Sequence, residues 1–282
     1  MGAMGIQRKN RVSTVALLVW SALPVWIGSM SMCSPAGAEE LTARQIMDRV
    51  DARDDGDNAI RDMEMILIDR HGNQRVRVLR SFSRDEGKDE HSILFFLSPA
   101  DVKDTGFLTY DYDEPERDDD QWLYLPALNR SKRIASSDKS GSFMGSDFSY
   151  ADMTDRPLDH YRFTLMKETE VEGRPVWQIE EVPITEHEKD ETGYTKSVVF
   201  VRKDNYVVVR GVSWVKKGNR LKYFDVKRLD QIDGIWVETE MHMTTKKGKT
   251  TLHKTILLAK NVRFNQNLSK DFFSVRQIEK GP

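Results

Sequence analysis

The chain has 282 residues, with 43 Lys and Arg against 45 Asp and Glu and a formal net charge of −2. Because both signs are interspersed along a slightly acidic chain, the composition argues against nucleic acid as a partner. A single cysteine cannot form a disulfide within the chain, so the fold must be held by a hydrophobic core, and this length permits a large one.

Residues 1–38 have the pattern of a secretory signal peptide. A basic stretch precedes an apolar run, and the small residues A-G-A that end at Ala38 form a cleavage site. We therefore predict cleavage after Ala38, export to a bacterial periplasm and a single domain over residues 39–282. The alternatives are an uncleaved membrane anchor, for which the apolar run is short, and lipid attachment at Cys33, where Met32 replaces the small residue that such a site needs.

The first predicted element after this segment is a helix at residues 41–53. Thr42 can act as its N-cap together with Gln45. The apolar residues of this stretch recur at helical spacing, as Leu41, Ile46, Met47 and Val50.

Most of the chain after this helix is predicted to form β-strands. Runs rich in Val, Ile, Thr and aromatic residues are separated by turns that contain glycine, such as DRHGNQ, EVEGRP, VKKGNR and QIDGIW. Several runs alternate between apolar and polar side chains. Because consecutive strands joined by tight turns pair with each other, the pattern predicts an antiparallel meander.

Two segments interrupt this pattern, an acidic loop at 111–121 and a long irregular stretch at 127–157. A loop of the second length is uncommon in a compact domain unless it has a function. Its centre, SGSFMGSDFSYADM, combines glycines and serines with the large side chains of Phe143, Met144, Phe148 and Tyr150. Two interpretations stay open: a mobile lip that contacts an apolar ligand, or a plug at the open edge of the sheet whose aromatic residues belong to the core.

The sequence contains no recognisable catalytic motif. Ser142 and Ser146 do not stand in the G-x-S-x-G pattern of a serine hydrolase, and the P-loop pattern is absent. His187 lacks the second histidine of H-E-x-x-H, while His242 and His253 flank a turn and alone make a poor zinc site. The acidic loops lack the ligand spacing of an EF-hand. We therefore predict no enzymatic activity, no metal site and no cofactor.

Large aromatic and methionine side chains are the more informative feature. They recur along the predicted strands and in the long loop, in excess of what one helix could cover, so we predict that part of them lines an apolar cavity. The candidate lipid-binding residues are Trp122, Tyr124, Phe143, Met144, Phe148, Tyr150, Trp177, Trp214, Phe224 and Trp236. The alternative for most of them is an ordinary sheet core.

Two stretches carry a resemblance to a known family. FFLSPADVKDTGFLTYDYDE and QWLYLPALNRSKRIASSDKSGSFMGSDFSYADM resemble the outer-membrane lipoprotein-sorting-like (LolA-like) proteins, relatives of the periplasmic lipoprotein carrier. The resemblance implies a mainly β fold: a curved antiparallel sheet that forms an incomplete β-barrel, with a few helices covering the concave side. It also implies a cavity for lipid or acyl chains and, in many members, association with resistance-nodulation-division type exporters.

Residues 39–282 are accordingly expected to form one LolA-like domain. The expected function is that of a periplasmic carrier or binding protein for a lipid or a lipid-modified protein, which moves apolar cargo between membranes without chemistry. The alternative is a non-enzymatic accessory protein that docks on an inner-membrane exporter of the resistance-nodulation-division type. Its docking candidates are Arg130, Lys132 and Arg133 and the acidic loop 111–120. An esterase that uses Ser142 or Ser146 is a third, more distant option.

Overall fold

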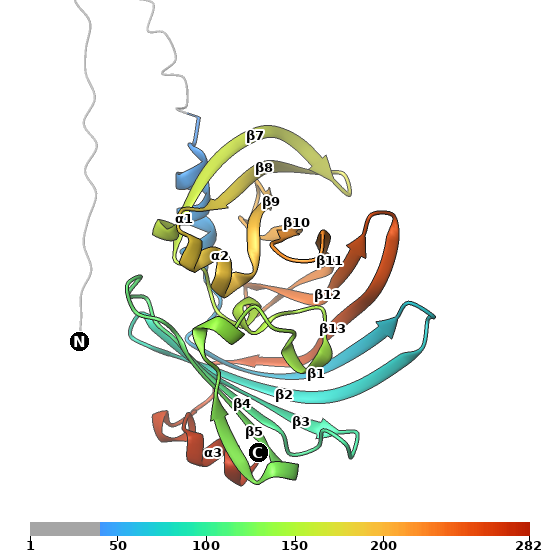
Figure 1. Cartoon of the computed structure of the whole chain (residues 1–282). Helices are drawn as coiled ribbons and strands as arrows, with labels where there is room; N and C mark the ends of the chain where they lie inside the picture. Colours follow the sequence, from blue (N-terminus) through green and yellow to red (C-terminus); the bar gives the residue numbers. More distant parts are fainter. Residues whose placement is uncertain (1–39) are drawn as a thin grey trace, which may run out of the picture. The chain divides into compact units, whose positions relative to one another are not determined.

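Thirteen strands of the computed structural model form one curved antiparallel sheet (Figure 1). The structure describes residues 40–282, so the predicted signal peptide and Cys33 lie outside the described residues. The strands are β1 (Asn58–Asp69), β2 (Gln74–Glu86), β3 (Asp89–Ser98), β4 (Gly106–Asp111), β5 (Asp120–Leu125), β6 (Arg130–Arg133), β7 (Tyr161–Val171), β8 (Arg174–Pro183), β9 (Tyr194–Arg202), β10 (Val208–Val215), β11 (Arg220–Ile232), β12 (Ile235–Lys247) and β13 (Thr250–Phe264).

The sheet is not closed. Its strand order is β6-β5-β4-β3-β2-β1-β13-β12-β11-β10-β9-β8-β7, so β6 and β7 are its two edges. The chain runs outward from β1 to the edge at β6, crosses the concave side, and returns from the other edge at β7 to β13, which pairs with β1. The predicted mainly β fold with an incomplete barrel is thus confirmed. Residues 41–282 form one compact unit.

Tight turns explain why neighbours in sequence are neighbours in the sheet. Between β7 and β8 the turn residues Glu172 and Gly173 have φ of 51° and 75°, and between β11 and β12 Asp233 and Gly234 have φ of 52° and 89°. Two successive residues in the left-handed region form a type I′ turn, whose twist matches that of the strands it joins. These glycine turns of the sequence are therefore hairpin turns.

Helices cover both faces of the sheet. They are α1 (Ala43–Asp51), α2 (Glu186–Thr192) and α3 (Val275–Lys280). The predicted Thr42–Gln45 capping box starts α1, which packs Met47 on the concave face of β8 and β9. In contrast, α3 packs on the convex face of β3 to β5. The contact is close at Gly106, because a Cβ placed on this residue would lie only 2.7 Å from the Cβ of Ile278. Within residues 40–282, no helix is long and apolar enough to cross a membrane.

Residues 134–160 connect β6 to β7 across the concave side (Figure 1, green), and we call this segment the plug. Its local structure consists of short 3₁₀ turns, η2 (Ser136–Asp138), η3 (Phe143–Gly145), η4 (Tyr150–Met153) and η5 (Leu158–His160). Phe143 is fully buried and Phe148 is 6% exposed, and both belong to one apolar cluster with Phe96 and Phe107 of the sheet. The structure thus agrees with the second interpretation of this stretch, in which its aromatic residues belong to the core.

Two short elements differ from the sequence prediction. Residues 130–133 form the edge strand β6, and η1 (Pro126–Leu128) precedes it, although this part of the chain is predicted to be irregular. Because β6 is short and largely exposed, its side chains lack the alternation that marks a strand. The second element, α2, is a short polar helix between the caps Thr185 and Gly193, without an apolar stripe long enough to predict it.

Candidate functional site on the concave side

The concave side of the sheet holds a cavity of 380 Å³ between α1, the plug and the concave face of β7 to β12. This volume lies in the range of ligand-binding cavities. Its apolar wall consists of Met47, Val50, Phe148, Leu158, Phe163, Val199, Val208, Phe224 and Met243. We call this space the first cavity.

A second cavity of 300 Å³ lies over β1 to β4, β12 and β13. Its apolar wall consists of Met63, Leu94, Phe107, Met153, Ile235, Trp236, Val237, Met241, Ala259 and Phe264. Arg53 and Asp55, which follow α1, line both cavities. The two cavities therefore adjoin each other at these two polar residues.

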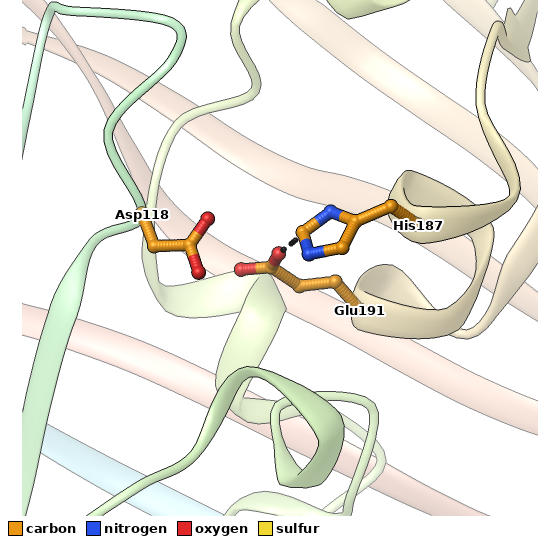
Figure 2. A group of neighbouring side chains, drawn as sticks. All are labelled: Asp118, His187 and Glu191. Atoms are coloured by element: carbon orange, nitrogen blue, oxygen red, sulfur yellow. Dashed lines mark ion pairs between the residues drawn. The ribbon is translucent and has the colours of Figure 1, made fainter.

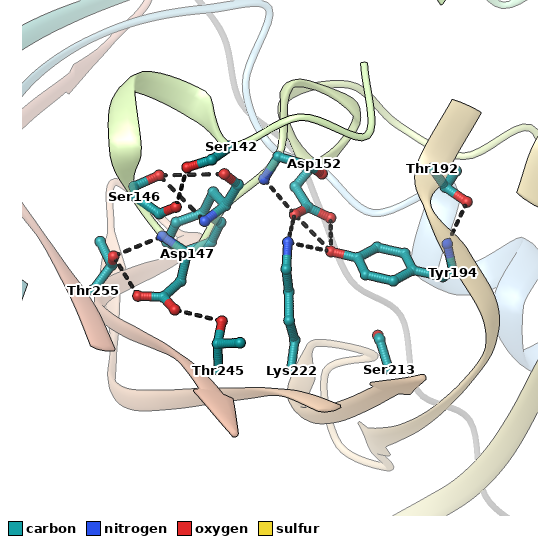
Figure 3. Close-up of polar contacts among 12 residues, drawn as sticks. Ser142, Ser146, Asp147, Asp152, Thr192, Tyr194, Ser213, Lys222, Thr245 and Thr255 are labelled. Atoms are coloured by element: carbon teal, nitrogen blue, oxygen red, sulfur yellow. Dashed lines mark hydrogen bonds and ion pairs between the residues drawn. The ribbon is translucent and has the colours of Figure 1, made fainter. Parts of the chain in front are cut away.

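A buried ion pair anchors the plug to the half of the sheet that holds the first cavity (Figure 3). Tyr194 of β9 donates a hydrogen bond of 2.8 Å to Oδ2 of Asp152, and Nζ of Lys222 of β11 lies 3.4 Å from the same oxygen and 2.9 Å from the tyrosine oxygen. Burial favours the protonated form of Asp152, but the charges of Lys222 and Arg156 outweigh it and hold the pKa of Asp152 below its usual value. Asp152 is therefore a charged anchor.

A second buried aspartate anchors the plug to β12 and β13 (Figure 3). Asp147 is 2% exposed and accepts hydrogen bonds from Thr245, at 2.5 Å, and from Thr255, at 2.8 Å. Its backbone N–H donates to Oγ1 of Thr255 at 2.9 Å, and the ring of His253 contacts its Oδ1. The plug is thus held by directed polar contacts as well as by its phenylalanines.

Acidic side chains gather where α1 and the end of the plug face β3 and β4. They line a third cavity of 490 Å³ and are Asp48, Asp51, Asp55, Asp85, Glu90, Asp111, Asp113, Asp155 and Asp159. Burial and the negative charge of Asp155 raise the pKa of Glu90 to about 7, against the opposing effect of Arg61. Burial, together with the charges of Asp119 and Asp155, also raises the pKa of Asp111.

Because the pKa of Glu90 is raised, we expect the contribution of this residue to the free energy of unfolding to fall as the pH rises. The pKa of Glu90 is raised in the folded state, so near neutral pH the folded chain holds a proton that the unfolded chain has released. The stability that this proton contributes is fully present at low pH and is lost as the pH rises through about 7. We expect the free energy of unfolding of wild type to fall relative to that of Glu90→Gln by about 1–3 kcal/mol between about pH 5 and about pH 8. Urea titrations at both pH values measure the difference. The exposed Glu170→Gln is the control, and equal pH dependence of wild type and Glu90→Gln would contradict the prediction.

The structure brings half of the predicted lipid-binding residues together. Phe143, Met144, Phe148, Tyr150 and Phe224 all belong to, or pack against, one cluster on the concave side. Phe148 and Phe224 of this group also line the first cavity.

Two further predicted residues lie elsewhere on the sheet. Trp236 lines the second cavity, and its ring is covered by the guanidinium of Arg202 at 5.6 Å. Trp177 packs in the cluster beneath α1 and stacks on Tyr206, with ring centroids 5.7 Å apart. Neither residue lines the first cavity.

The remaining three predicted residues face the convex side. Trp122 and Tyr124 belong to the cluster under α3, and the ring of Trp122 packs edge-on against Tyr110. Trp214 follows Ser213, which lines the first cavity, so it points the other way, and its ring lies 4.5 Å from Nζ of Lys196. These three side chains therefore have no access to the cavities on the concave side.

Both serines and two of the three basic residues singled out in the sequence have structural partners. Ser142 donates a hydrogen bond to the backbone oxygen of Ser146, and the Ser146 hydroxyl accepts from the N–H of Phe148, so both shape the plug. Lys132 pairs with Asp138 at 3.5 Å and Arg133 pairs with Asp120. Docking of this basic stretch on an exporter stays a prediction.

Sequence reasoning missed the two aspartate anchors. Asp147 and Asp152 stand in the long irregular stretch, but their partners on the sheet lie from 42 to 108 positions away in the chain, on four different strands. No local pattern links residues at such separations. The one available signal is that two acids stand among glycines and aromatic residues in a stretch without other acids at its centre.

Comparisons with known proteins agree with this architecture. A crystal structure of an outer membrane lipoprotein-sorting protein domain from Vibrio parahaemolyticus has a TM-score of 0.76 and 33% identity over 84% of this chain and 98% of that one. A DUF1329 family protein from Desulfovibrio piger has a TM-score of 0.76 and 31% identity over 84% and 97%. A LolA superfamily protein from Nitrosomonas europaea shares the fold, with a TM-score of 0.63 and 16% identity over 84% and 99%.

The fold is therefore that of the LolA-like proteins. A family model described as "Uncharacterized protein" matches residues 88–280, while no curated protein matches the sequence. The chain belongs to the DUF1329 family, a LolA-like family of outer-membrane lipoprotein-sorting-like proteins.

Proposed function

We propose that this protein is a periplasmic carrier or binding protein that holds an acyl chain of a lipid, or of a lipid-modified protein, on the concave side of its sheet. The observation that carries the proposal is the first cavity, whose 380 Å³ are walled by α1, the plug and apolar residues of the sheet. The lipoprotein-sorting domain from Vibrio parahaemolyticus, at 33% identity, supports the same class of cargo.

The energetics of such binding require no special residue. Each CH₂ group that leaves water contributes about 0.8 kcal/mol, so a 16-carbon chain yields roughly 12 kcal/mol if it is fully buried. The costs of association and of ordering the chain reduce this value substantially. The result is an affinity from which cargo can be released.

The polar groups around the first cavity support binding without chemistry. Lys222 pairs with Asp152 and Tyr194, and Arg156 pairs with Glu181 at 3.2 Å, so these side chains serve as partners of one another. We therefore propose a non-enzymatic protein. Its export, and with it the periplasmic location, rests on the predicted signal peptide at residues 1–38.

A substitution that fills the first cavity tests the proposal. Gly211 of β10 lines this cavity, and a Cβ placed on it would lie 3.6 Å from the Cβ of Phe224 and 3.9 Å from Cγ1 of Val199, which is ordinary contact. The rest of a leucine side chain would extend into the space of the ligand. If it excludes about two CH₂ groups of the acyl chain, Gly211→Leu should weaken binding of a fluorescent fatty acid about tenfold, with little change in melting temperature.

The neighbouring Val212→Leu is the matched control, because Val212 faces the opposite side of the same strand. It should bind the fatty acid as wild type does. Equal affinity of Gly211→Leu and wild type would exclude the first cavity as the binding site. Wild-type protein that carries no lipid when purified from the periplasm and takes up no fatty acid would overturn the proposed function as a whole.

A further inference from the structure

The acidic loop between β4 and β5 and the helix α2 meet beside the plug (Figure 2). Asp118 comes from the loop, and His187 and Glu191 come from α2. One ligand atom of each of the three residues lies within 4.8 Å of those of the other two. They thus form a constellation of one imidazole and two carboxylates, built from two parts of the chain that are far apart in sequence.

The helix sets the spacing of two of these side chains. His187 and Glu191 are four positions apart and lie one above the other on the same face of α2, with Nδ1 of the histidine 3.7 Å from Oε2 of the glutamate. The caps Thr185 and Gly193 fix the ends of this helix. The pair therefore presents a nitrogen and an oxygen in one direction, toward the acidic loop (Figure 2).

Both carboxylates are oriented by residues of the plug. Ser136 donates a hydrogen bond of 2.7 Å to Oδ2 of Asp118, and the buried ammonium of Lys139 pairs with Oε1 of Glu191. The other oxygen of Glu191, Oε2, is the one beside the His187 ring. Partners that orient ligating side chains in this way are a regular feature of metal sites in proteins.

The donor set selects the class of ion. Calcium and magnesium prefer sites made of oxygen atoms alone, whereas an imidazole nitrogen with two carboxylate oxygens suits zinc and its neighbours in the first transition series. Three protein ligands leave one position of a tetrahedral zinc ion to water.

We propose that Asp118, His187 and Glu191 bind a divalent transition-metal ion, with Zn²⁺ as the best fit. The ion links the β4–β5 loop, which belongs to one half of the open sheet, to α2, which belongs to the other half. It thereby bridges the side where the sheet is not closed and fixes the segment of the plug that carries Ser136 and Lys139. The predicted absence of a metal site was based on short sequence motifs, and such motifs cannot identify ligands that are about 70 positions apart in the chain.

Metal titration of the purified, chelator-treated protein tests the proposal. Zn²⁺ titrated by calorimetry, and Co²⁺ followed by its absorption spectrum, should each show one ion per chain. His187→Ala and Asp118→Asn should each weaken Zn²⁺ binding about tenfold or more. Saturating Zn²⁺ should also raise the melting temperature of wild type, because the ion binds the folded chain only, and it should raise that of His187→Ala much less.

The exposed His71→Ala, in the turn between β1 and β2, is the matched control and should bind Zn²⁺ as wild type does. The proposal is overturned if wild type binds no ion at about 100 μM Zn²⁺, a concentration well above the dissociation constants of structural zinc sites. It is also overturned if His187→Ala and Asp118→Asn bind Zn²⁺ as wild type does. Loss of binding in His71→Ala alone would also overturn it. None of these measurements uses lipid, so the result is independent of the proposed carrier function.

Discussion

Replacing Phe143 and Phe148 together by alanine is expected to leave the domain unfolded or barely folded at room temperature. Both side chains are buried, and Phe143 packs against Phe107 and Tyr150 with ring centroids 5.0 and 5.5 Å apart. A buried phenylalanine truncated to alanine costs about 3–5 kcal/mol. Two such losses approach or exceed the roughly 5–15 kcal/mol that stabilise a typical domain. Far-ultraviolet circular dichroism during thermal melting measures the loss.

The single variant Phe148→Ala keeps this test informative if the double variant cannot be purified. Its melting temperature should fall clearly, whereas that of Leu128→Ala, which removes a side chain that is 68% exposed, should change little. A double variant that melts close to wild type but takes up acyl chains poorly would contradict the structural role. It would instead make the two phenylalanines a gate at the cavity.

Replacing Asp147 by alanine is expected to cost about 3–5 kcal/mol, the usual range for removing one partner from a buried charged contact. The substitution leaves the hydroxyls of Thr245 and Thr255, which are 2% and 0% exposed, without the carboxylate that they bond. Because the lost contacts join the plug to β12 and β13, the plug should also loosen before the sheet does. Urea unfolding measures the first effect, and limited proteolysis within residues 134–160 measures the second.

Asp138→Ala is the control for this prediction, because Asp138 is an exposed aspartate of the same segment whose ion pair with Lys132 is open to solvent. Its cost should be about 0–1 kcal/mol. Asp147→Asn keeps the size and one acceptor of the side chain, so its effect should lie between the two. If Asp147→Ala and Asp138→Ala unfold at the same urea concentration, the buried contacts do not anchor the plug.

The sheet could be predicted from the sequence because its signals are local. Glycine turns such as Glu172–Gly173 set the hairpins, and alternation marks strands with one buried face. Alternation does not say which face is concave, however. Trp122 and Phe143 are both large aromatic residues, yet Trp122 packs under α3 on the convex face and Phe143 lies in the plug on the concave side.

The candidate site was harder to predict because its residues are far apart in the sequence and are brought together only when the chain folds. Lys222 and Asp152 form an ion pair across 70 positions of the chain, and each side chain taken alone resembles an ordinary surface charge. The same holds for Asp118 and His187, which the open side of the sheet brings together. Aromatic and methionine content indicated an apolar cavity, and Phe or Met side chains do form part of the wall of the first cavity, but of the ten candidate residues only Phe148 and Phe224 line it.

The connection between the two sheet edges runs across the concave side, so under the proposed carrier function the chain itself would compete with cargo for that space. If such cargo needs more room than the 380 Å³ of the first cavity and displaces part of the plug, its apparent affinity equals its intrinsic affinity multiplied by the fraction of molecules in which the plug is undocked. Each 1.4 kcal/mol of plug docking weakens such binding about tenfold. Loading and unloading of large cargo would thus be set by the contacts of Asp147 and Asp152 rather than by the cavity wall, and a partner that grips the plug could expel cargo without touching it.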